Sequence, residues 1–165
     1  MPTRIGGPAP RIQVPAYVAG RRNARLVGPV DERGRWVALA FYGRDFQTDC
    51  ASHLIDLAAL RPAFEDEGVT VMAATASSWL SHRRWFAHHP QLAAVDFPVL
   101  ADPHGELARA FGVLLSNGAC RRSTFLIDAN GIVRHAGGDA EEPFDTLCAL
   151  YDARSPGWPE LLAAA

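Results

Sequence analysis

The sequence predicts an α/β fold in which a mixed, largely parallel sheet carries helices on both faces. Apolar runs of strand length alternate along the chain with segments of helical periodicity, the order that builds parallel strands joined by crossover helices. The run at 36–42 has seven apolar residues without a polar break, as a strand buried on both faces requires. Two further strands, 123–127 and 132–135, flank the turn 128–131 as an antiparallel hairpin ending in Gly131. The expected architecture is a three-layer sandwich.

The remaining helices and strands are predicted from the glycine, proline and capping residues that mark their ends. Gly and Pro are frequent in residues 1–20, which predicts an extended lead-in with a short edge strand at 12–14. Gly68 is typical of a helix C-terminus, and Asp102-Pro103 of an N-cap followed by the first helical residue. The other expected elements are a helix from Cys50 to about 67, strands at 69–74 and 97–100, and helices at 79–89, 102–111 and 142–152.

Length and composition narrow the functional classes. The 165 residues fit one domain, expected to span residues 1–165. A formal net charge of −2 predicts no nucleic-acid surface. Because no stretch approaches the ~20 apolar residues of a membrane span, and Met1-Pro2-Thr3-Arg4 leads into no apolar run, the protein is expected to be cytoplasmic.

Three cysteines, Cys50, Cys120 and Cys148, are too few and too scattered for a disulfide scaffold. No two of them form a CxxC pair, which argues against zinc and against a dithiol, and no metal or cofactor is predicted. Cys148, flanked by Leu147 and Leu150 on the last helix, is expected in the core.

Cys50 has the position of a reactive thiol. It stands where the loop after the 36–42 strand enters a helix, and such loops carry the active site in many α/β sheets. Free N–H groups and the helix dipole favour a thiolate there. Arg122, at the start of another strand, is the candidate for a neighbouring positive charge.

Five segments then resemble the peroxiredoxins, the alkyl hydroperoxide reductase and thiol-specific antioxidant family. In order, these segments are Gly6-Gly7-Pro8-Ala9-Pro10, 41–50 (Phe-Tyr-Gly-Arg-Asp-Phe-Gln-Thr-Asp-Cys), 78–85, 101–113 and 122–128. The resemblance covers most of the chain and implies a thioredoxin-like fold, in agreement with the strand order read from the sequence.

The resemblance also implies a mechanism. The Cys50 thiolate attacks a peroxide oxygen and becomes a sulfenic acid, while Arg122 holds the thiolate and polarises the peroxide. Gln47 stands where the family has a threonine that bonds both thiolate and peroxide, so it is a candidate catalytic residue. Tyr42, Gly43 and Thr48 of the same segment are the expected substrate-binding residues.

Three positions depart from the family pattern. Gly43 replaces a proline that stiffens the loop, and Gln47 replaces the threonine. Gln47 has an amide that can donate a hydrogen bond, although its side chain is longer. His53 replaces a glutamate that bridges to the arginine, and is expected to cap the helix or face solvent.

The resolving cysteine and the partners are open at this stage. The segment 154–158 has no Cys-Pro motif, and Ile55 stands where one subclass has its second cysteine. Cys120 is the candidate resolving residue, but a one-cysteine mechanism with an external thiol reductant is favoured. A homodimer is expected from the family, with contacts near Phe46 and Trp79.

Two rival functions remain. The altered loop is also what a non-catalytic peroxiredoxin-like binding protein would have. Cys50-Ala51-Ser52-His53 has the spacing of a CxxC motif with histidine in the second place, which suits a monothiol disulfide oxidoreductase. Weaker still are a zinc site from His82, His88 and His89, which are expected to be exposed, and a serine hydrolase, for which the sequence has no GxSxG elbow.

Overall fold

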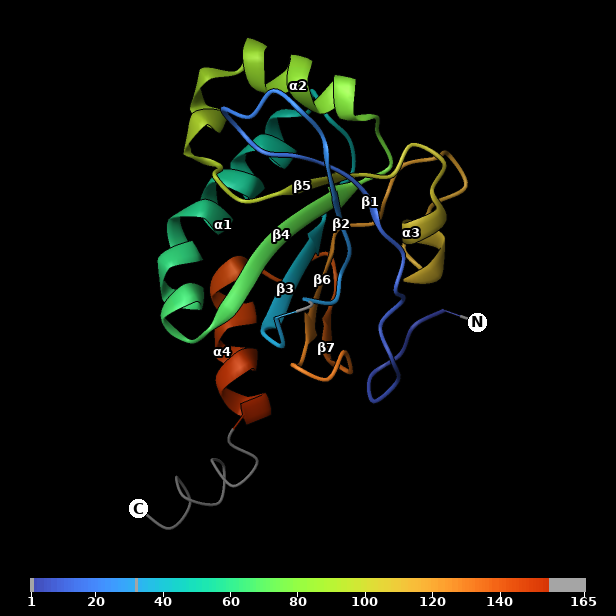
Figure 1. Ribbon diagram of the computed structural model, residues 1–165, viewed down its shortest axis with the longest axis vertical. Helices are drawn as coiled ribbons and strands as arrows, with labels where there is room; N and C mark the ends of the chain where they lie inside the picture. Colours follow the sequence, from blue (N-terminus) through green and yellow to red (C-terminus); the bar gives the residue numbers. More distant parts are fainter. Residues whose placement is uncertain (1, 32, 155–165) are drawn as a thin grey trace.

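The computed structural model describes residues 2–31 and 33–154, which build a mixed sheet between two layers of helix and coil (Figure 1). The strands of the described part lie in the order β2-β1-β5-β4-β3-β6-β7. Their bounds are β1 Val14–Tyr17, β2 Arg25–Val27, β3 Trp36–Phe41, β4 Val69–Thr75, β5 Val99–Ala101, β6 Ser123–Ile127 and β7 Val133–Gly137. Of the segment 154–158, which the sequence analysis searched for a Cys-Pro motif, residues 155–158 lie outside the described residues.

The centre of the sheet is the parallel triplet β3, β4 and β5. The apolar run predicted as a buried strand is β3, whose last five residues are buried. Its side chains alternate between the two faces, with Ala38 and Ala40 on one side and Val37 and Leu39 on the other. Both faces are therefore covered, which explains why the sequence shows no polar residue in this run.

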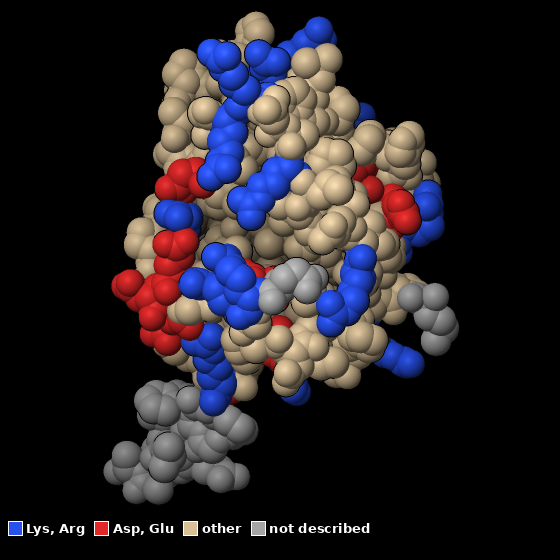
Figure 2. Space-filling view, in the orientation of Figure 1, with Lys and Arg blue, Asp and Glu red and all other residues tan. Residues whose placement is uncertain are grey.

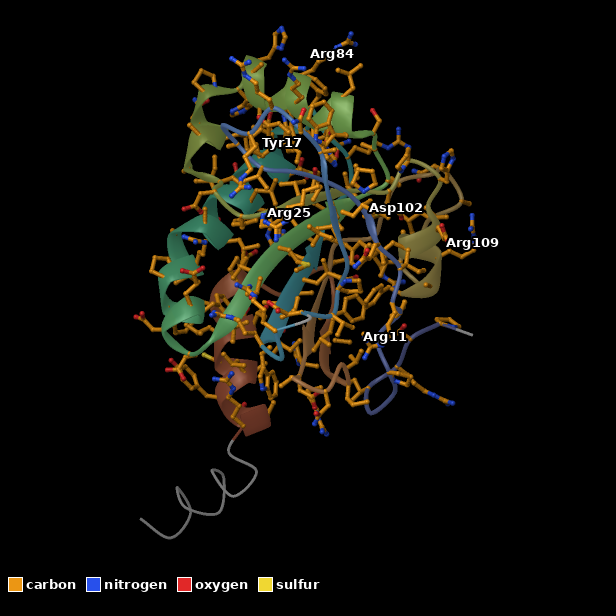
Figure 3. All side chains as sticks on the ribbon, viewed as in Figure 1. Arg11, Tyr17, Arg25, Arg84, Asp102 and Arg109 are labelled. Carbon is orange, nitrogen blue, oxygen red and sulfur yellow. The ribbon has the colours of Figure 1, made fainter. Side chains whose placement is uncertain are left out.

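Helices cover the two faces unequally. One face packs against α1 Thr48–Asp66, α2 Trp79–His88, the 3₁₀ turn η1 Pro90–Ala94 and α4 Pro143–Arg154. The other packs against α3 Glu106–Ala110 and the N-terminal segment. In Figure 3, Tyr17 of β1 lies beneath α2, where its ring centroid is 4.8 Å from that of Phe86. The three-layer, thioredoxin-like α/β sandwich is confirmed.

The predicted hairpin is present, and the N-terminal prediction was wrong in detail. β6 and β7 pair antiparallel, and Gly131 in their turn has φ of 80°, a conformation that favours glycine. The expected edge strand is β1, which starts at Val14 and pairs on both sides, with β2 and with β5. On this side of the sheet the edge strand is β2, which pairs only with β1. The periodicity of its own three residues gave no signal for a strand.

Asp102 caps a helix, as predicted, but the helix begins later than expected. The Asp102 carboxylate accepts hydrogen bonds from the backbone N–H groups of Leu107 (3.1 Å) and Ala108 (2.8 Å). Residues 102–105 form a turn, closed by the bond from Gly105 N–H to the Asp102 carbonyl at 2.9 Å. Gly105 at φ of 69° then starts α3, so the proline after Asp102 belongs to this turn and not to the helix.

Charges are distributed unevenly over the surface. Basic side chains spread over the face that carries β1 and β2, and acidic ones gather at the edge formed by α1 (Figure 2).

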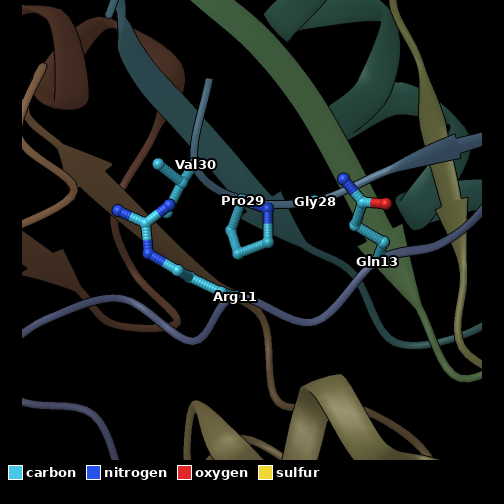
Figure 4. A pocket seen from close by; sticks show the side chains of 5 residues that line it. All are labelled: Arg11, Gln13, Gly28, Pro29 and Val30. Carbon is cyan, nitrogen blue, oxygen red and sulfur yellow. The ribbon is translucent and has the colours of Figure 1, made fainter. Parts of the chain in front are cut away.

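A small cavity of about 20 Å³ lies beside the segment that follows β2, between Arg11, Gln13 and Val30, and has room for about one water molecule (Figure 4). In the part of the chain that the structure describes, no helix is long and apolar enough to span a membrane.

Candidate active site at Cys50

Sheet register brings the site together. Phe41, the last residue of β3, pairs with Ser123, the first residue of β6. The next residues outward, Tyr42 and Arg122, therefore lie at the same edge of the sheet. Thr75 at the end of β4 fixes the chain there, because its hydroxyl donates to the carbonyls of Tyr42 (2.7 Å) and Gly43 (3.1 Å).

Cys50 lies in the first turn of α1. The helix begins at Thr48 with Gln47 as N-cap, and the Ala51 N–H donates to the Gln47 carbonyl at 3.0 Å. The N–H groups of the first turn have no earlier helical carbonyl to bond, so they and the helix dipole favour negative charge at the Cys50 sulfur. Cys50 is 8% exposed, which leaves its sulfur reachable from one side. The predicted position of the thiol at a helix start is therefore correct.

Gln47 contacts the thiol directly. The Cys50 Sγ donates to the Gln47 Oε1 at 3.4 Å, a contact made possible by the chain turn at Phe46, whose φ is 65°. A Cβ added at Gly43 would lie 3.4 Å from the Gln47 Oε1 and 3.7 Å from the Cys50 Sγ. A side-chain carbon at position 43, where the family pattern has a proline ring, would therefore be in van der Waals contact with both side chains.

Asp45 fixes the position of the loop that leads from β3 to Cys50. Its carboxylate, buried within the protein, accepts from the Tyr42 hydroxyl at 2.7 Å and the Ser81 hydroxyl at 2.6 Å, and it pairs with the His82 Nδ1 at 2.8 Å. The His82 Nε2 faces the Leu100 carbonyl at 3.2 Å. The His82 ring therefore bridges the Asp45 carboxylate and the Leu100 carbonyl. The pair ties the Cys50 loop to α2 and β5.

Arg122 is oriented by the residues that lead into α4. Its Nη2 donates to the Glu141 carbonyl at 3.3 Å and pairs with the Glu142 carboxylate at 3.1 Å. Glu141 is itself held, because its carboxylate accepts from the His135 Nε2 at 2.6 Å and the Thr146 hydroxyl at 2.9 Å. Glu142 therefore supplies the acidic partner that the family pattern places three residues after the cysteine.

The expectation for His53 was wrong. His53 is 4% exposed and neither caps α1 nor faces solvent. It lies one turn after Cys50, on the helix face that packs against the sheet. Burial, with the positive charge of Arg122 as the second cause, lowers the pKa of His53 to about 4, so the ring is neutral at pH 7.

A cavity of about 240 Å³ joins these groups. It is lined by Tyr42, Gly43, Gln47, Asp49, Cys50, His53, Leu115, Cys120, Arg121, Arg122 and Asp139. The predicted residues Cys50, Arg122, Gln47, Gly43 and Tyr42 meet here, although the Tyr42 hydroxyl is engaged with Asp45. Thr48 is exposed and does not line the cavity, because as first residue of α1 it points away from the sheet.

The other two cysteines differ from each other in exposure. Cys120 is 3% exposed and lines the cavity, and its N–H donates to the Gly43 carbonyl at 3.3 Å. Burial raises the pKa of the Cys120 thiol. The core prediction for Cys148 was wrong: the residue is exposed. The buried face of α4 carries Thr146, Leu147 and Leu150, and a 100° step per residue turns Cys148 out of it.

The histidines at 82, 88 and 89 do not share one environment. His82 is fully buried in the pair with Asp45, contrary to the expectation of an exposed ring, and His88 is exposed. Within residues 2–31 and 33–154, no group of three His, Cys, Asp or Glu side chains is arranged to hold a metal ion.

The profile of the AhpC/TSA family matches residues 5–136, four-fifths of the chain. The chain belongs to this family, the peroxiredoxins. Membership confirms the resemblance found in the sequence and the assignment to the peroxiredoxin-type peroxidases.

Relatives of this peroxiredoxin extend over most of its length. Alkyl hydroperoxide reductase C of Mycobacterium tuberculosis is 30% identical, with 90% of this chain and 83% of that protein covered. Peroxiredoxin tpx1 of Schizosaccharomyces pombe is 32% identical, with 81% and 71% covered. The solved structure of Mycobacterium tuberculosis AhpC superposes with a TM-score of 0.84 at 25% identity, over 94% of this chain and 96% of that one.

Sequence reasoning missed two parts of the site. Asp45 and His82 lie inside segments that carry the resemblance, but nothing local distinguishes a buried pair from two surface charges. Glu142 comes from the start of α4, 20 positions after Arg122 in the chain, and no spacing rule links the two residues. Both pairings arise from the packing of elements that are distant in sequence.

Proposed function

We propose that the protein is a thiol-dependent peroxidase that reduces hydrogen peroxide or alkyl hydroperoxides through a sulfenic acid at Cys50. The observation that carries this proposal is the shared cavity of Cys50, in the first turn of α1, and Arg122, at the start of β6. A thiolate needs positive charge and hydrogen-bond donors nearby, and these two elements supply both. The names of its relatives, alkyl hydroperoxide reductase and thioredoxin peroxidase, support the same chemistry.

In the proposed reaction, the Cys50 thiolate attacks the nearer oxygen of the hydroperoxide and the O–O bond breaks. The sulfur gives up two electrons and becomes a sulfenic acid, and the departing alkoxide takes a proton to leave as alcohol or water. The Arg122 guanidinium stabilises the negative charge that develops on the departing oxygen. Gln47, with its amide turned to present Nε2, donates to the thiolate and the peroxide.

The protein uses a one-cysteine cycle in this proposal. Cys120 lines the cavity, but its thiol is buried and its pKa is raised, so little thiolate is available to attack the sulfenic acid. An external thiol, thioredoxin-like or of low molecular weight, then forms a mixed disulfide with Cys50 and releases water. A second thiol restores Cys50. A reducing cytoplasm would supply such thiols.

A homodimer is part of the same proposal. Three apolar side chains near the cavity are exposed, Phe46 by 58%, Leu80 by 47% and Leu115 by 41%. Contact with a second subunit would remove them from water, whereas Trp79 is already half-buried in the subunit itself. Sedimentation of the wild type and of Phe46→Glu tests this contact. The wild type should be a dimer, and Phe46→Glu should be a monomer.

The deciding experiment is the intact mass of reduced protein after one equivalent of hydrogen peroxide, with a sulfenic-acid trap present, followed by peptide mapping. A trap adduct at Cys50 within seconds is the expected result, and Cys50→Ser is the control that must stay unmodified. A Cys50–Cys120 disulfide would replace the one-cysteine cycle by an intramolecular one. No modification of the wild type after many minutes would refute the peroxidase.

One contact favours a non-catalytic binding protein as the second candidate. An amide oxygen that accepts from the Cys50 S–H, as the Gln47 Oε1 does, stabilises the thiol and not the reactive thiolate. The absence of any Cys50 modification would support this candidate. Disulfide exchange without a reaction with peroxide would instead indicate a monothiol oxidoreductase.

A further inference from the structure

Two polar groups in the cavity lack the partners that buried groups normally have. Among the described residues, neither ring nitrogen of His53 has a hydrogen-bond partner, and the same holds for the Arg122 Nε. All three atoms are buried, and both residues line the cavity that holds Cys50. Buried polar atoms are almost always hydrogen-bonded in folded proteins. Because two residues with unpartnered atoms line the same cavity, we expect a further hydrogen-bonding group to lie between them.

The chemistry of the two residues defines that group. The Arg122 Nε–H can only donate, and a neutral imidazole offers one nitrogen that accepts. His53 is neutral at pH 7, because burial and Arg122 lower its pKa to about 4, against the opposing charges of Glu142 and Asp56. One oxygen that accepts from Arg122 and donates its own hydrogen to His53 satisfies both residues. The hydroxyl of a sulfenic acid on Cys50 is an oxygen of this kind.

We propose that His53 and Arg122 together hold the hydroxyl of the Cys50 sulfenic acid. Cys50 and His53 are three residues apart in α1, so the two side chains lie on one helix face and a new oxygen on the Cys50 sulfur forms beside the imidazole. The proposal rests on the proposed function, since peroxide supplies this oxygen. His53 is thus a positioning residue for the oxidised enzyme.

The hydrogen bond to His53 should slow further oxidation of the Cys50 sulfenic acid. A second hydroperoxide turns the sulfenic acid into a sulfinic acid, with release of one alcohol or water, and the deprotonated sulfenate is the reactive form. A neutral acceptor needs the hydroxyl hydrogen and so favours the protonated sulfenic acid. Loss of this bond would favour the sulfenate, and one unit of change in the pKa of the sulfenic acid alters the sulfenate fraction about tenfold.

The test compares His53→Leu with wild type and with His53→Gln, whose amide keeps an acceptor. Mass spectrometry follows two rates separately: formation of the Cys50 sulfenic acid with one equivalent of peroxide, and its conversion to sulfinic acid in excess peroxide. We expect conversion about tenfold faster in His53→Leu and a rate near wild type in His53→Gln. Equal conversion rates in wild type and His53→Leu would overturn the proposal while leaving the peroxidase intact.

A measurement on the wild type covers the case in which His53→Leu fails to fold. The ¹⁵N resonances of the His53 ring are recorded before and after one equivalent of peroxide, with Cys50→Ser treated in the same way. We expect the acceptor nitrogen to shift in the wild type alone. A Cys50 sulfenic acid that forms without this shift refutes the role of His53, whereas the absence of a sulfenic acid refutes the proposed function as well.

Discussion

The Cys50 Sγ lies 3.4 Å from the Oε1 of Gln47, and the thiol donates its hydrogen to that amide oxygen. The bond places an adaptable side chain where the family pattern has a threonine hydroxyl. As an acceptor the amide favours the thiol, and after rotation its Nε2 favours the thiolate. We therefore propose that the reactivity of Cys50 depends on which end of the Gln47 amide faces the sulfur.

Substitution of Gln47 should shift the Cys50 titration in opposite directions. Gln47→Thr supplies a hydroxyl donor to the thiolate and should lower the pH at which Cys50 reacts, whereas Gln47→Glu adds a negative charge and should raise it. The measurement is the rate of iodoacetamide alkylation of Cys50 across pH. Gln91→Thr is the matched control, because Gln91 is exposed in η1 and does not line the cavity. Identical profiles for the threonine and glutamate variants would contradict this role.

Removal of Arg122 should slow the reaction with peroxide. Arg122→Ala takes away the guanidinium from the cavity, which leaves the departing oxygen without a donor, at a cost of roughly a hundredfold in kcat/KM. Cys50→Ser should abolish turnover. Peroxide consumption by stopped-flow checks both. Arg84→Ala, an exposed arginine on α2 (Figure 3), is the control and should retain the wild-type rate.

His53 should make stability depend on pH in a defined window. Its pKa is lowered in the folded protein from 6.5 to about 4, so between these values the unfolded chain binds more protons. Stability is then fully present above pH 6.5 and is lost as pH falls toward 4, by roughly 3 kcal/mol, since 2.5 units correspond to about 1.36 kcal/mol each. Urea unfolding at several pH values measures this loss. The profile of His53→Leu should be flatter by the same amount.

The Asp45–His82 pair should be important for both stability and loop position. Asp45→Asn removes the buried carboxylate that accepts from Tyr42 and Ser81 and contacts His82, and each buried partner left unsatisfied costs about 1–3 kcal/mol. The loop from Gly43 to Gln47 also loses its anchor, so alkylation of Cys50 should change along with the melting temperature. Calorimetry measures the first effect. Asp152→Asn, at an exposed position of α4, should change stability by less than about 0.5 kcal/mol.

The sequence predicted the parts of the fold that local chemistry specifies. The unbroken apolar run of β3 requires burial on both faces, and Gly131 provides the positive φ that its hairpin turn adopts. The same holds for Cys50, because a loop between a buried strand and a helix leads a side chain to a helix start. Arg122 was a candidate from its place at the start of a strand and then through the resemblance, and the register of β3 with β6 shows why it lies near this loop.

Errors arose where contacts between distant elements decide the outcome. The edge strand β2 exists only through its pairing with β1, and the exposure of Cys148 depends on which face of α4 meets the sheet. His53 replaces a charged residue, which suggested solvent, but the packing of α1 buries it.

The sequence by itself determined the α/β class, the central strand, the hairpin and the place of Cys50 at a helix start, because backbone preference and hydrophobic pattern are encoded in neighbouring residues. Only the tertiary structure decided that Glu142 orients Arg122, that Asp45 and His82 form a buried pair, and that His53 faces the cavity with no hydrogen-bond partner among the described residues. These pairings join residues 20 to 37 positions apart in sequence. Burial also sets their charge states, and burial is a property of the assembled fold.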